Sequence, residues 1–220
     1  MTPDSIDPPI KLNIIDVPAA EPAEQVLVLL HGWGANAQDV AGLADYLQLP
    51  KTRMFFPNGP FAHPMTPVGR MWYGFPPSYD FRSPPMFEGQ ADLQQSRQLL
   101  LNWLETLPEQ TGIPLEKTIL GGFSQGGAMT LDVGPRLPLA GMMVLSGYVH
   151  LPEVPKAVSD RPVLVIHGRQ DTVVPIGLAG ESRSQLQAQG LTVNYQEFDM
   201  GHEISLPALQ MVGGFCQAQR

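Results

Sequence analysis

The stretch Thr118-Ile-Leu-Gly-Gly-Phe-Ser-Gln-Gly-Gly127 decides the fold of this chain. Its first three residues are an apolar run that predicts a short strand, and the glycines after Ser124 predict the start of a helix. Ser124 is the centre of a G-x-S-x-G motif, in which small residues permit a sharp turn between strand and helix. Such a turn holds the hydroxyl at the strand end and leaves the next N–H free to stabilise an oxyanion. The motif alone is weak evidence in a chain with 22 glycines, because serine is also favoured as a helix N-cap.

A nucleophilic serine needs a histidine base and a carboxylate that orients the base. In this strand–turn–helix arrangement the chain order is serine, then acid, then histidine. Asp171 follows the apolar run 162–168, and His202 follows the alternating run 191–198. Both are therefore predicted just past the C-terminal end of a strand, where such sheets place their functional groups. Ser124, Asp171 and His202 are the predicted catalytic triad.

These residues also have purely structural alternatives. Asp171 is compatible with an Asx turn, and His202 with a surface loop. Among the other histidines, His167 is expected to pack or hydrogen-bond beneath the Asp171 loop, whereas nothing in the sequence around His150 and His63 indicates a catalytic base. The triad is favoured because three matched groups occur in the required order at three strand ends.

The predicted oxyanion hole consists of two backbone N–H groups. One belongs to Gln125, the residue after the nucleophile. The other comes from the loop after the apolar run 26–30, which predicts a parallel strand buried on both faces. Glycines on both sides of Trp33 let this loop turn inward, so the Trp33 N–H is the second predicted donor. His31 is expected to brace the loop, and the Trp33 ring is compatible with a cover over the core.

Five motifs, in order along nearly the whole chain, resemble those of one known family. They are L-H-G-W-G-A-N (30–36), G-F-S-Q-G-G-A (122–128), L-S-G-Y (145–148), H-G-R-Q-D-T-V-V-P (167–175) and G-H-E (201–203). In them the chain resembles the phospholipase/carboxylesterase family of α/β-hydrolases, which includes the acyl-protein thioesterases. The resemblance implies hydrolysis of carboxylic esters or thioesters with no metal and no cofactor, and it gives Ser124, Asp171 and His202 the triad roles. The chain departs from the family at 72–74, where Trp-Tyr-Gly replaces the frequent Trp-Phe-Asp.

Strand-like and helix-like runs alternate along the chain. Strands are expected at about 10–15, 26–30, 52–56, 118–120, 142–145, 163–167 and 191–198, and helices at about 39–47, 89–107 and 176–189, directly after Ser124 and after His202. This alternation predicts the α/β class, an α/β-hydrolase fold with a mostly parallel central sheet and helices on both faces. No linker divides the 220 residues, so residues 1–220 are expected to form a single domain.

Residues 57–89 interrupt this alternation. Eight prolines exclude a continuous helix or a central strand, yet the segment is rich in large apolar side chains. We expect a lid-like loop that forms an apolar wall for an acyl chain. The predicted substrate-binding residues are Trp72, Phe75, Phe81, Met86 and Phe87. The alternatives are a loop that only covers the edge of the core and a face that forms a homodimer.

Composition excludes several classes of function. A formal net charge of −8 argues against a nucleic-acid partner, because binding phosphates needs basic clusters. No window of 18 apolar residues occurs, and the N-terminus lacks a basic region followed by an apolar core, so we expect no stable membrane insertion and no signal peptide. The single cysteine, Cys216, excludes an internal disulfide and is typical of the reducing cytoplasm. Its position in a late helical segment predicts a packing role.

The sequence therefore predicts a serine hydrolase. Ser124 would attack a carboxylic ester, or a thioester, and water would then cleave the resulting acyl-enzyme. The predicted partner is a small-molecule acyl ester or thioester. One alternative is a hydrolase of small lactones or xenobiotic esters, and another is a non-catalytic binding module of the same fold. The intact set of Ser124, Asp171 and His202 argues against a pure binding module.

Overall fold

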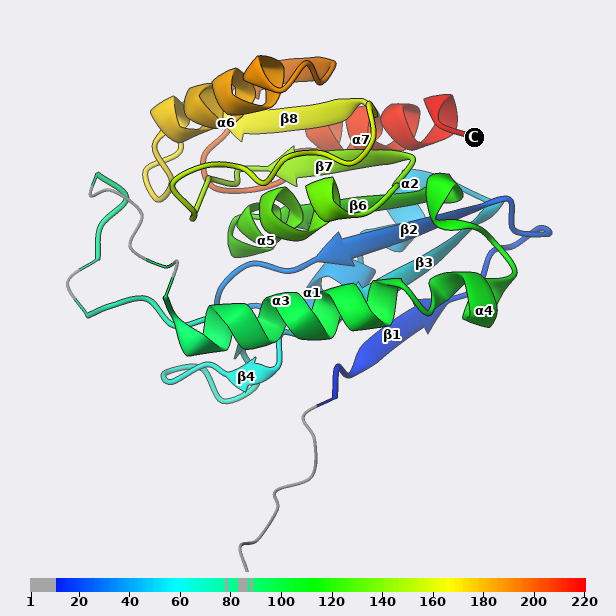
Figure 1. Cartoon of the computed structure of the whole chain (residues 1–220), viewed down its shortest axis with the longest axis horizontal. Coiled ribbons are helices and arrows are strands. Elements are labelled where there is room, and N and C mark those ends of the chain that lie inside the picture. Colours follow the sequence, from blue (N-terminus) through cyan, green and yellow to red (C-terminus); the bar gives the residue numbers. More distant parts are fainter. Residues whose placement is uncertain (1–10, 78, 83–86, 88) are drawn as a thin grey trace, which may run out of the picture.

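A computed structural model describes residues 11–77, 79–82, 87 and 89–220 (Figure 1). Its centre is a seven-stranded sheet in the order β1-β3-β2-β6-β7-β8-β9. β1 pairs antiparallel with β3, and every other neighbouring pair in this sheet is parallel. The seven strands are β1 (Ile14–Val17), β2 (Gln25–Leu30), β3 (Thr52–Pro57), β6 (Thr118–Phe123), β7 (Gly141–Leu145), β8 (Val163–Gly168) and β9 (Val193–Phe198).

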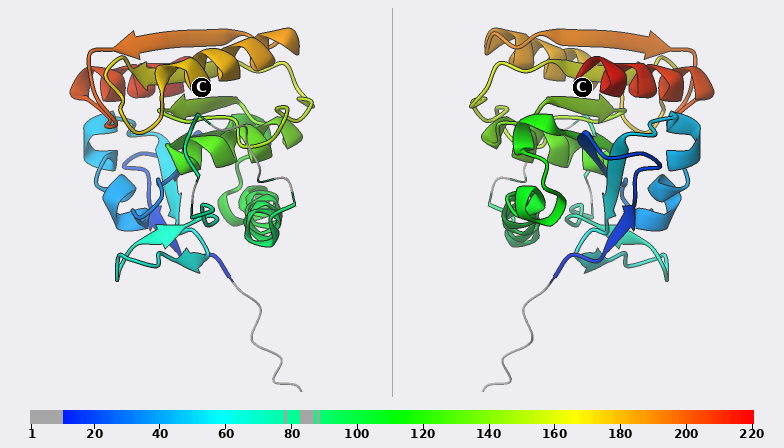
Figure 2. Two further views of the ribbon diagram at one scale, coloured as in Figure 1. Left: turned by 90° about the vertical axis from the view of Figure 1, so that its left-hand side faces the viewer. Right: turned by 90° about the vertical axis from the view of Figure 1, so that its right-hand side faces the viewer.

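Helices cover both faces of this sheet, as the sequence predicts (Figure 2). The α-helices are α1 (Ala37–Ala41), α2 (Ala44–Leu47), α3 (Ala91–Leu104), α4 (Leu107–Thr111), α5 (Gln125–Val133), α6 (Ile176–Ala188) and α7 (Leu206–Ala218). All six residues of β2 are buried, and they alternate between two cores. Val26, Val28 and Leu30 pack in the core that holds the apolar sides of α3, α5 and α6. Leu27 and Leu29 pack in the core that holds those of α1, α2 and α7.

The C-terminal ends of the parallel strands meet at one edge of the sheet. In Figure 1 the arrowheads of β2, β6, β7 and β8 point to the same side. Trp33, Ser124, Asp171 and His202 follow β2, β6, β8 and β9, respectively, by only a few residues. This topology brings segments that are far apart in the sequence to one place, as expected for a sheet of this kind.

The helix expected near 39–47 is divided into α1 and α2, so the prediction of one helix there is wrong, whereas the long helix expected at about 89–107 is present as α3. α1 begins at Asn36, whose side chain accepts hydrogen bonds from the backbones of Gln38 and Asp39 while Asp39 caps the Asn36 N–H. It ends at Gly42, and α2 is a separate turn. α3 ends at Leu104, and α4 starts anew with a proline in its first turn, where proline is tolerated.

The proline-rich segment contributes a small hairpin of its own, β4 (Phe61–Ala62) with β5 (Arg70–Met71). Directly after the hairpin, Trp72 and Tyr73 are wholly buried in the same core as α3 and α5. The described part of residues 57–89 therefore closes this side of the core as well as bordering the strand ends. Within the described residues, no helix has the length and apolar character that crossing a membrane requires.

Cys216 packs as the sequence predicts. It lies on the buried side of α7, with its Sγ atom 4.0 Å from the Met143 Sδ atom. Burial raises the pKa of the Cys216 thiol to about 12. The thiol therefore stays protonated at neutral pH and is a core group, not a nucleophile.

Candidate active site

Ser124 stands in a strained turn between β6 and α5. Its φ of 53° and ψ of −115° lie outside the regions that most residues adopt, as a nucleophile elbow requires. The flanking glycines permit this turn, because a Cβ atom on Gly122 would lie 2.2 Å from the Gly126 backbone. A Cβ atom on Gly126 would in turn lie 2.4 Å from the Leu30 carbonyl oxygen. The backbone thus holds the Ser124 side chain at the C-terminal end of β6.

The structure brings the three predicted triad residues into one hydrogen-bonded chain. The His202 Nε2 atom lies 2.9 Å from the Ser124 Oγ atom, and the His202 Nδ1 atom lies 2.7 Å from the Asp171 Oδ2 atom. Because the carboxylate accepts a hydrogen bond from Nδ1–H, Nε2 is left with a lone pair that can accept the serine proton. The arrangement can therefore activate the hydroxyl for attack on a carbonyl carbon.

Asp171 is held in place from three sides. Its Oδ1 atom accepts hydrogen bonds from the backbone N–H groups of Val173 and Val174, at 2.9 and 2.8 Å. Below it, His167 Nε2 donates to the Val174 carbonyl oxygen at 2.8 Å and lies 3.4 Å from Asp171 Oδ2. Burial lowers the pKa of His167, which keeps its ring neutral. His167 thus supports the Asp171 loop, in agreement with the prediction for it.

The two predicted oxyanion donors adjoin Ser124. Gln125 is the first residue of α5, and Gly32, which precedes Trp33, lies so close that its Cβ would be 3.3 Å from Ser124 Cβ. Within the described part of the chain, neither the Gln125 nor the Trp33 backbone N–H donates to a protein group. His31 braces this loop, because its Nδ1 donates to the Gly32 carbonyl at 2.7 Å and its Nε2 accepts from Gly59 N–H at 2.8 Å. Burial lowers the pKa of His31 to about 4, which is consistent with this neutral form.

The side chain of Gln125 has a second role that the sequence does not reveal. Its amide oxygen accepts from the Trp72 N–H at 2.9 Å, and its amide nitrogen donates to the Tyr73 carbonyl at 2.8 Å. Trp72 also donates its indole N–H to the His31 carbonyl oxygen at 3.0 Å. These bonds join the proline-rich segment to the first turn of α5 and to the loop after β2.

We expect Gln125→Met to lower the free energy of unfolding by about 2–6 kcal/mol, because it leaves two buried backbone groups without partners, at ~1–3 kcal/mol each. Denaturant unfolding measures this loss. Gln98→Met is the matched control, since Gln98 is exposed and, within the described part of the chain, its side chain bonds to Asn102 alone. Equal unfolding midpoints for the two variants would contradict the role of the Gln125 amide.

The predicted substrate-binding residues fall into three groups. Trp72 and Phe87 are wholly buried, so the expectation that they line an acyl site is wrong in this structure; their rings belong to the core. Met86 lies outside the described residues. Phe75 and Phe81 are half-buried and lie at the strand-end edge. The centroids of their rings are 5.7 Å apart, and the centroid of the Phe75 ring is 5.4 Å from that of the Trp33 ring.

Phe75 and Phe81 belong to a small apolar group that adjoins the triad, which we call the Tyr148 cluster. Its members are Phe75, Phe81, Ala128, Tyr148, Val174 and Leu178. Ala128 is one helical turn after Ser124, and its N–H donates to the Ser124 carbonyl at 3.0 Å. Val174 binds the Asp171 carboxylate through its backbone. The cluster therefore borders both the nucleophile and the acid.

Sequence reasoning missed a buried polar group behind this cluster, formed by Tyr73, Asp132, Tyr148 and His150. The sequence around His150 gives no sign of a carboxylate partner, but the structure places its Nε2 atom 3.1 Å from Asp132 Oδ2. The two residues are 18 positions apart and come from different elements, so no local pattern could indicate the contact. Among the described residues, the His63 Nδ1 atom accepts hydrogen bonds from the nearby N–H groups of Met65 and Thr66.

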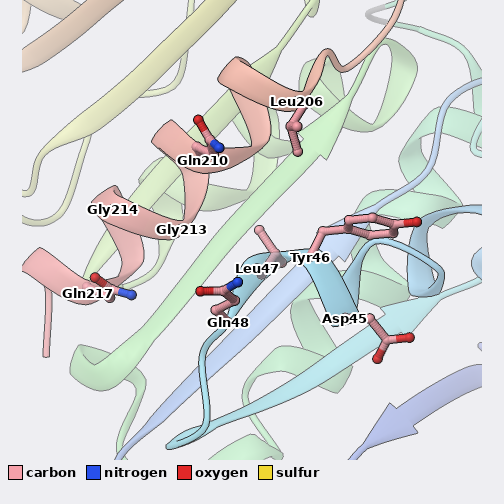
Figure 3. A pocket seen from close by; sticks show the side chains of 9 residues that line it. All are labelled: Asp45, Tyr46, Leu47, Gln48, Leu206, Gln210, Gly213, Gly214 and Gln217. Carbon is pink, nitrogen blue, oxygen red and sulfur yellow. The ribbon is translucent and has the colours of Figure 1, made fainter.

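A surface pocket of about 340 Å³ lies between α2 and α7 (Figure 3). Tyr46 and Asp45 of α2 border it on one side, and Leu206 and Gln210 of α7 on the other. Its lining contains no triad residue and no pairing of a nucleophile with a base. Among the described residues, no group of three or more His, Cys, Asp or Glu side chains is arranged to hold a metal ion. The described residues thus bring together a serine, a histidine and a carboxylate at the strand ends around Ser124.

Comparisons with known proteins show which family the chain matches. The family model described as Phospholipase/Carboxylesterase matches residues 13–219. Acyl-protein thioesterase 1 of Kluyveromyces lactis is 29% identical over 215 residues, which cover 90% of this chain and 94% of the relative. Acyl-protein thioesterase 1 of Saccharomyces cerevisiae is 30% identical over 191 residues, covering 80% and 83%. The crystal structure of esterase PE8 superposes with a TM-score of 0.86 at 30% identity, covering 96% of this chain and 100% of that one.

Proposed function

Because the chain belongs to the phospholipase/carboxylesterase family of hydrolases, we propose that it cleaves carboxylic esters through a Ser124–His202–Asp171 triad and an acyl-enzyme intermediate. The observation that carries this proposal is the continuous hydrogen-bonded chain from the Ser124 hydroxyl through His202 to the Asp171 carboxylate. A binding module of the same fold would have no need of this alignment.

The proposed cycle has two halves. His202 accepts the Ser124 proton while the serine oxygen attacks the acyl carbonyl, and the N–H groups of Gln125 and Trp33 stabilise the oxyanion. Protonated His202 then donates to the leaving alkoxide or thiolate. Water repeats the sequence on the acyl-enzyme and releases the carboxylic acid. Asp171 orients the imidazole and stabilises its charged form throughout.

Thioesters are the second proposed substrate class. Two relatives that match most of this chain are acyl-protein thioesterases, which supports a thiolate as a leaving group here. Oxygen esters and thioesters share the same acyl-enzyme, so the triad serves both. The half-buried rings of Phe75 and Phe81, which pack in the Tyr148 cluster, support an acyl group with an apolar chain over a small lactone. A cytoplasmic location and the formation of a homodimer stay predictions. The single buried thiol of Cys216 supports the first of them.

The test combines turnover with active-site labelling. Initial rates are measured on p-nitrophenyl esters from acetate to dodecanoate and on the matching acyl thioesters, and a fluorophosphonate probe counts activated serines. We expect one labelled serine per chain, at Ser124, and a rate that peaks at one chain length. A chain that hydrolyses none of these esters or thioesters and does not react with the probe would contradict the proposal and favour a binding module.

A further inference from the structure

Behind the triad lies a buried polar chain that the proposed cycle does not use. The Tyr73 hydroxyl is 2.7 Å from the Tyr148 hydroxyl and 3.0 Å from His150 Nδ1, and His150 Nε2 is 3.1 Å from Asp132 Oδ2. None of these four side chains is more than 2% exposed. Arg97 of α3 binds both oxygens of the Asp132 carboxylate, at 2.8 and 2.9 Å. These hydrogen-bonded side chains thus link two helices, the loop after β7 and the proline-rich segment.

The protons in this chain can be arranged in only one way while the imidazole is neutral. The Asp132 carboxylate is held by Arg97 and accepts a hydrogen bond from His150 Nε2–H, so His150 Nδ1 must accept a hydrogen bond. Tyr73 donates its only hydroxyl proton to that nitrogen. Tyr148 must therefore donate to the Tyr73 oxygen.

Burial fixes these protonation states. It lowers the pKa of His150 and raises the pKa values of Tyr73 and Tyr148, so all three side chains stay neutral near pH 7. Burial also opposes ionisation of Asp132, but the hydrogen bonds from His150 and Arg97 outweigh it and hold the pKa of that carboxyl well below its usual range. Every donor of the chain then has an acceptor, which favours one rigid arrangement over several alternatives.

The polar chain ends inside the Tyr148 cluster. The Tyr148 ring packs against the Phe81 ring with centroids 4.8 Å apart, and the Tyr73 ring packs against Phe75 at 5.8 Å. Phe75 and Phe81 belong to the proline-rich segment. Both are half-buried, and both are members of the Tyr148 cluster. Fixing the two tyrosine rings therefore fixes the surface on which the two phenylalanine rings rest.

We propose that the chain Asp132–His150–Tyr73–Tyr148 is a positioning device that holds the Tyr148 cluster as a preformed wall for an extended apolar acyl group. This inference rests on the proposed ester hydrolysis and adds how the site distinguishes acyl lengths. The half-buried Phe75 and Phe81 contact the acyl group, whereas the buried Tyr148, Tyr73 and His150 act only through them. A wall that is already in place binds the chain without first ordering its own side chains.

The test compares acyl preference in variants of the positioning residues. The readout is the ratio of kcat/KM for p-nitrophenyl octanoate to that for p-nitrophenyl acetate, with rates divided by the concentration of fluorophosphonate-labelled sites. We expect Tyr73→Phe and His150→Leu to lower this ratio by about tenfold, mainly through a higher KM for the octanoate. A loss of this size is typical when a binding pocket loses some of its apolar contact with the substrate. Because the ratio counts only active sites, partial unfolding does not imitate the effect.

Conservative variants separate positioning from general destabilisation. His150→Gln can still donate to Asp132 and accept from Tyr73, so its ratio should recover toward that of the wild type. Tyr148→Phe keeps the ring and loses only the last hydroxyl, and it should lower the ratio less than Tyr73→Phe does. Tyr195→Phe is the matched control, because its hydroxyl bonds to Glu197 on β9, outside the polar chain.

The outcomes distinguish the two proposals. A wild type that is labelled at Ser124 and prefers octanoate, with ratios that fall in Tyr73→Phe and recover in His150→Gln, supports the positioning role. A labelled wild type without preference for the longer chain, or ratios in Tyr73→Phe and His150→Leu equal to that of Tyr195→Phe, would overturn it while leaving the hydrolase intact. A wild type that is neither labelled nor active would overturn the proposed function itself.

Discussion

Ser124→Ala is expected to lower kcat/KM for every ester and thioester by roughly a millionfold, the size of loss seen when a triad nucleophile is removed. The methyl group cannot form the acyl-enzyme, and only transition-state binding by the backbone donors remains. The strained turn keeps its shape, because alanine is no larger than serine. Progress curves at high enzyme concentration, together with loss of fluorophosphonate labelling, measure this effect.

The same interpretation predicts that the activity losses caused by substituting different triad residues are not additive. His202 Nε2 is 2.9 Å from Ser124 Oγ and acts through that one atom. Ser124→Ala/His202→Ala should therefore be no less active than Ser124→Ala alone, since residues that act as one unit are lost together. If Ser124→Ala lowered kcat/KM by less than about a hundredfold, the loss would be much smaller than the loss expected on removing a triad member, and another group would be the nucleophile. A double variant far below the single would show that the two act independently.

The position of the site was predictable because it depends on topology. Parallel strands place their C-terminal ends at one edge, so residues after β6, β8 and β9 converge whatever the details of packing. The order serine, acid, histidine and the strand-end positions of Ser124, Asp171 and His202 could be read without any distance. The predicted family and fold class are confirmed for the same reason, because both depend on motifs and on alternation along the whole chain.

What the sequence did not reveal depends on contacts between distant residues. Trp72 looks like a binding residue in a proline-rich segment, but its indole N–H finds a carbonyl after β2 and its ring enters the core. The link between Tyr73 and His150 spans 77 positions, and the link between Gln125 and Trp72 spans 53. The boundaries of the helix expected at 39–47 were missed for a local reason, because Asn36 caps the start of α1 and α1 ends at Gly42.

Asp171→Asn is expected to lower kcat/KM by about ten-thousandfold, although the side chain keeps its shape, because it reverses the tautomer of His202. The backbone N–H groups of Val173 and Val174 both donate to Oδ1, so the asparagine oxygen must occupy that position. Its NH2 group then faces His202 Nδ1 at the place where Oδ2 accepts a hydrogen bond from Nδ1–H in the wild type. Nδ1 must become the acceptor, and the proton moves to Nε2.

With its proton on Nε2, His202 can no longer accept the Ser124 proton, so the serine hydroxyl keeps it and the nucleophile is not activated. Asp199→Asn is the matched control, because Asp199 is an exposed carboxylate after β9 that pairs only with Arg169 in the structure. It should leave kcat/KM within a few-fold of wild type, as substitution at an exposed ion pair changes little. Equal activity of Asp171→Asn and Asp199→Asn would show that the carboxylate does not set the tautomer. The backbone donors at 173 and 174 thus determine that an amide fails here where a carboxylate works.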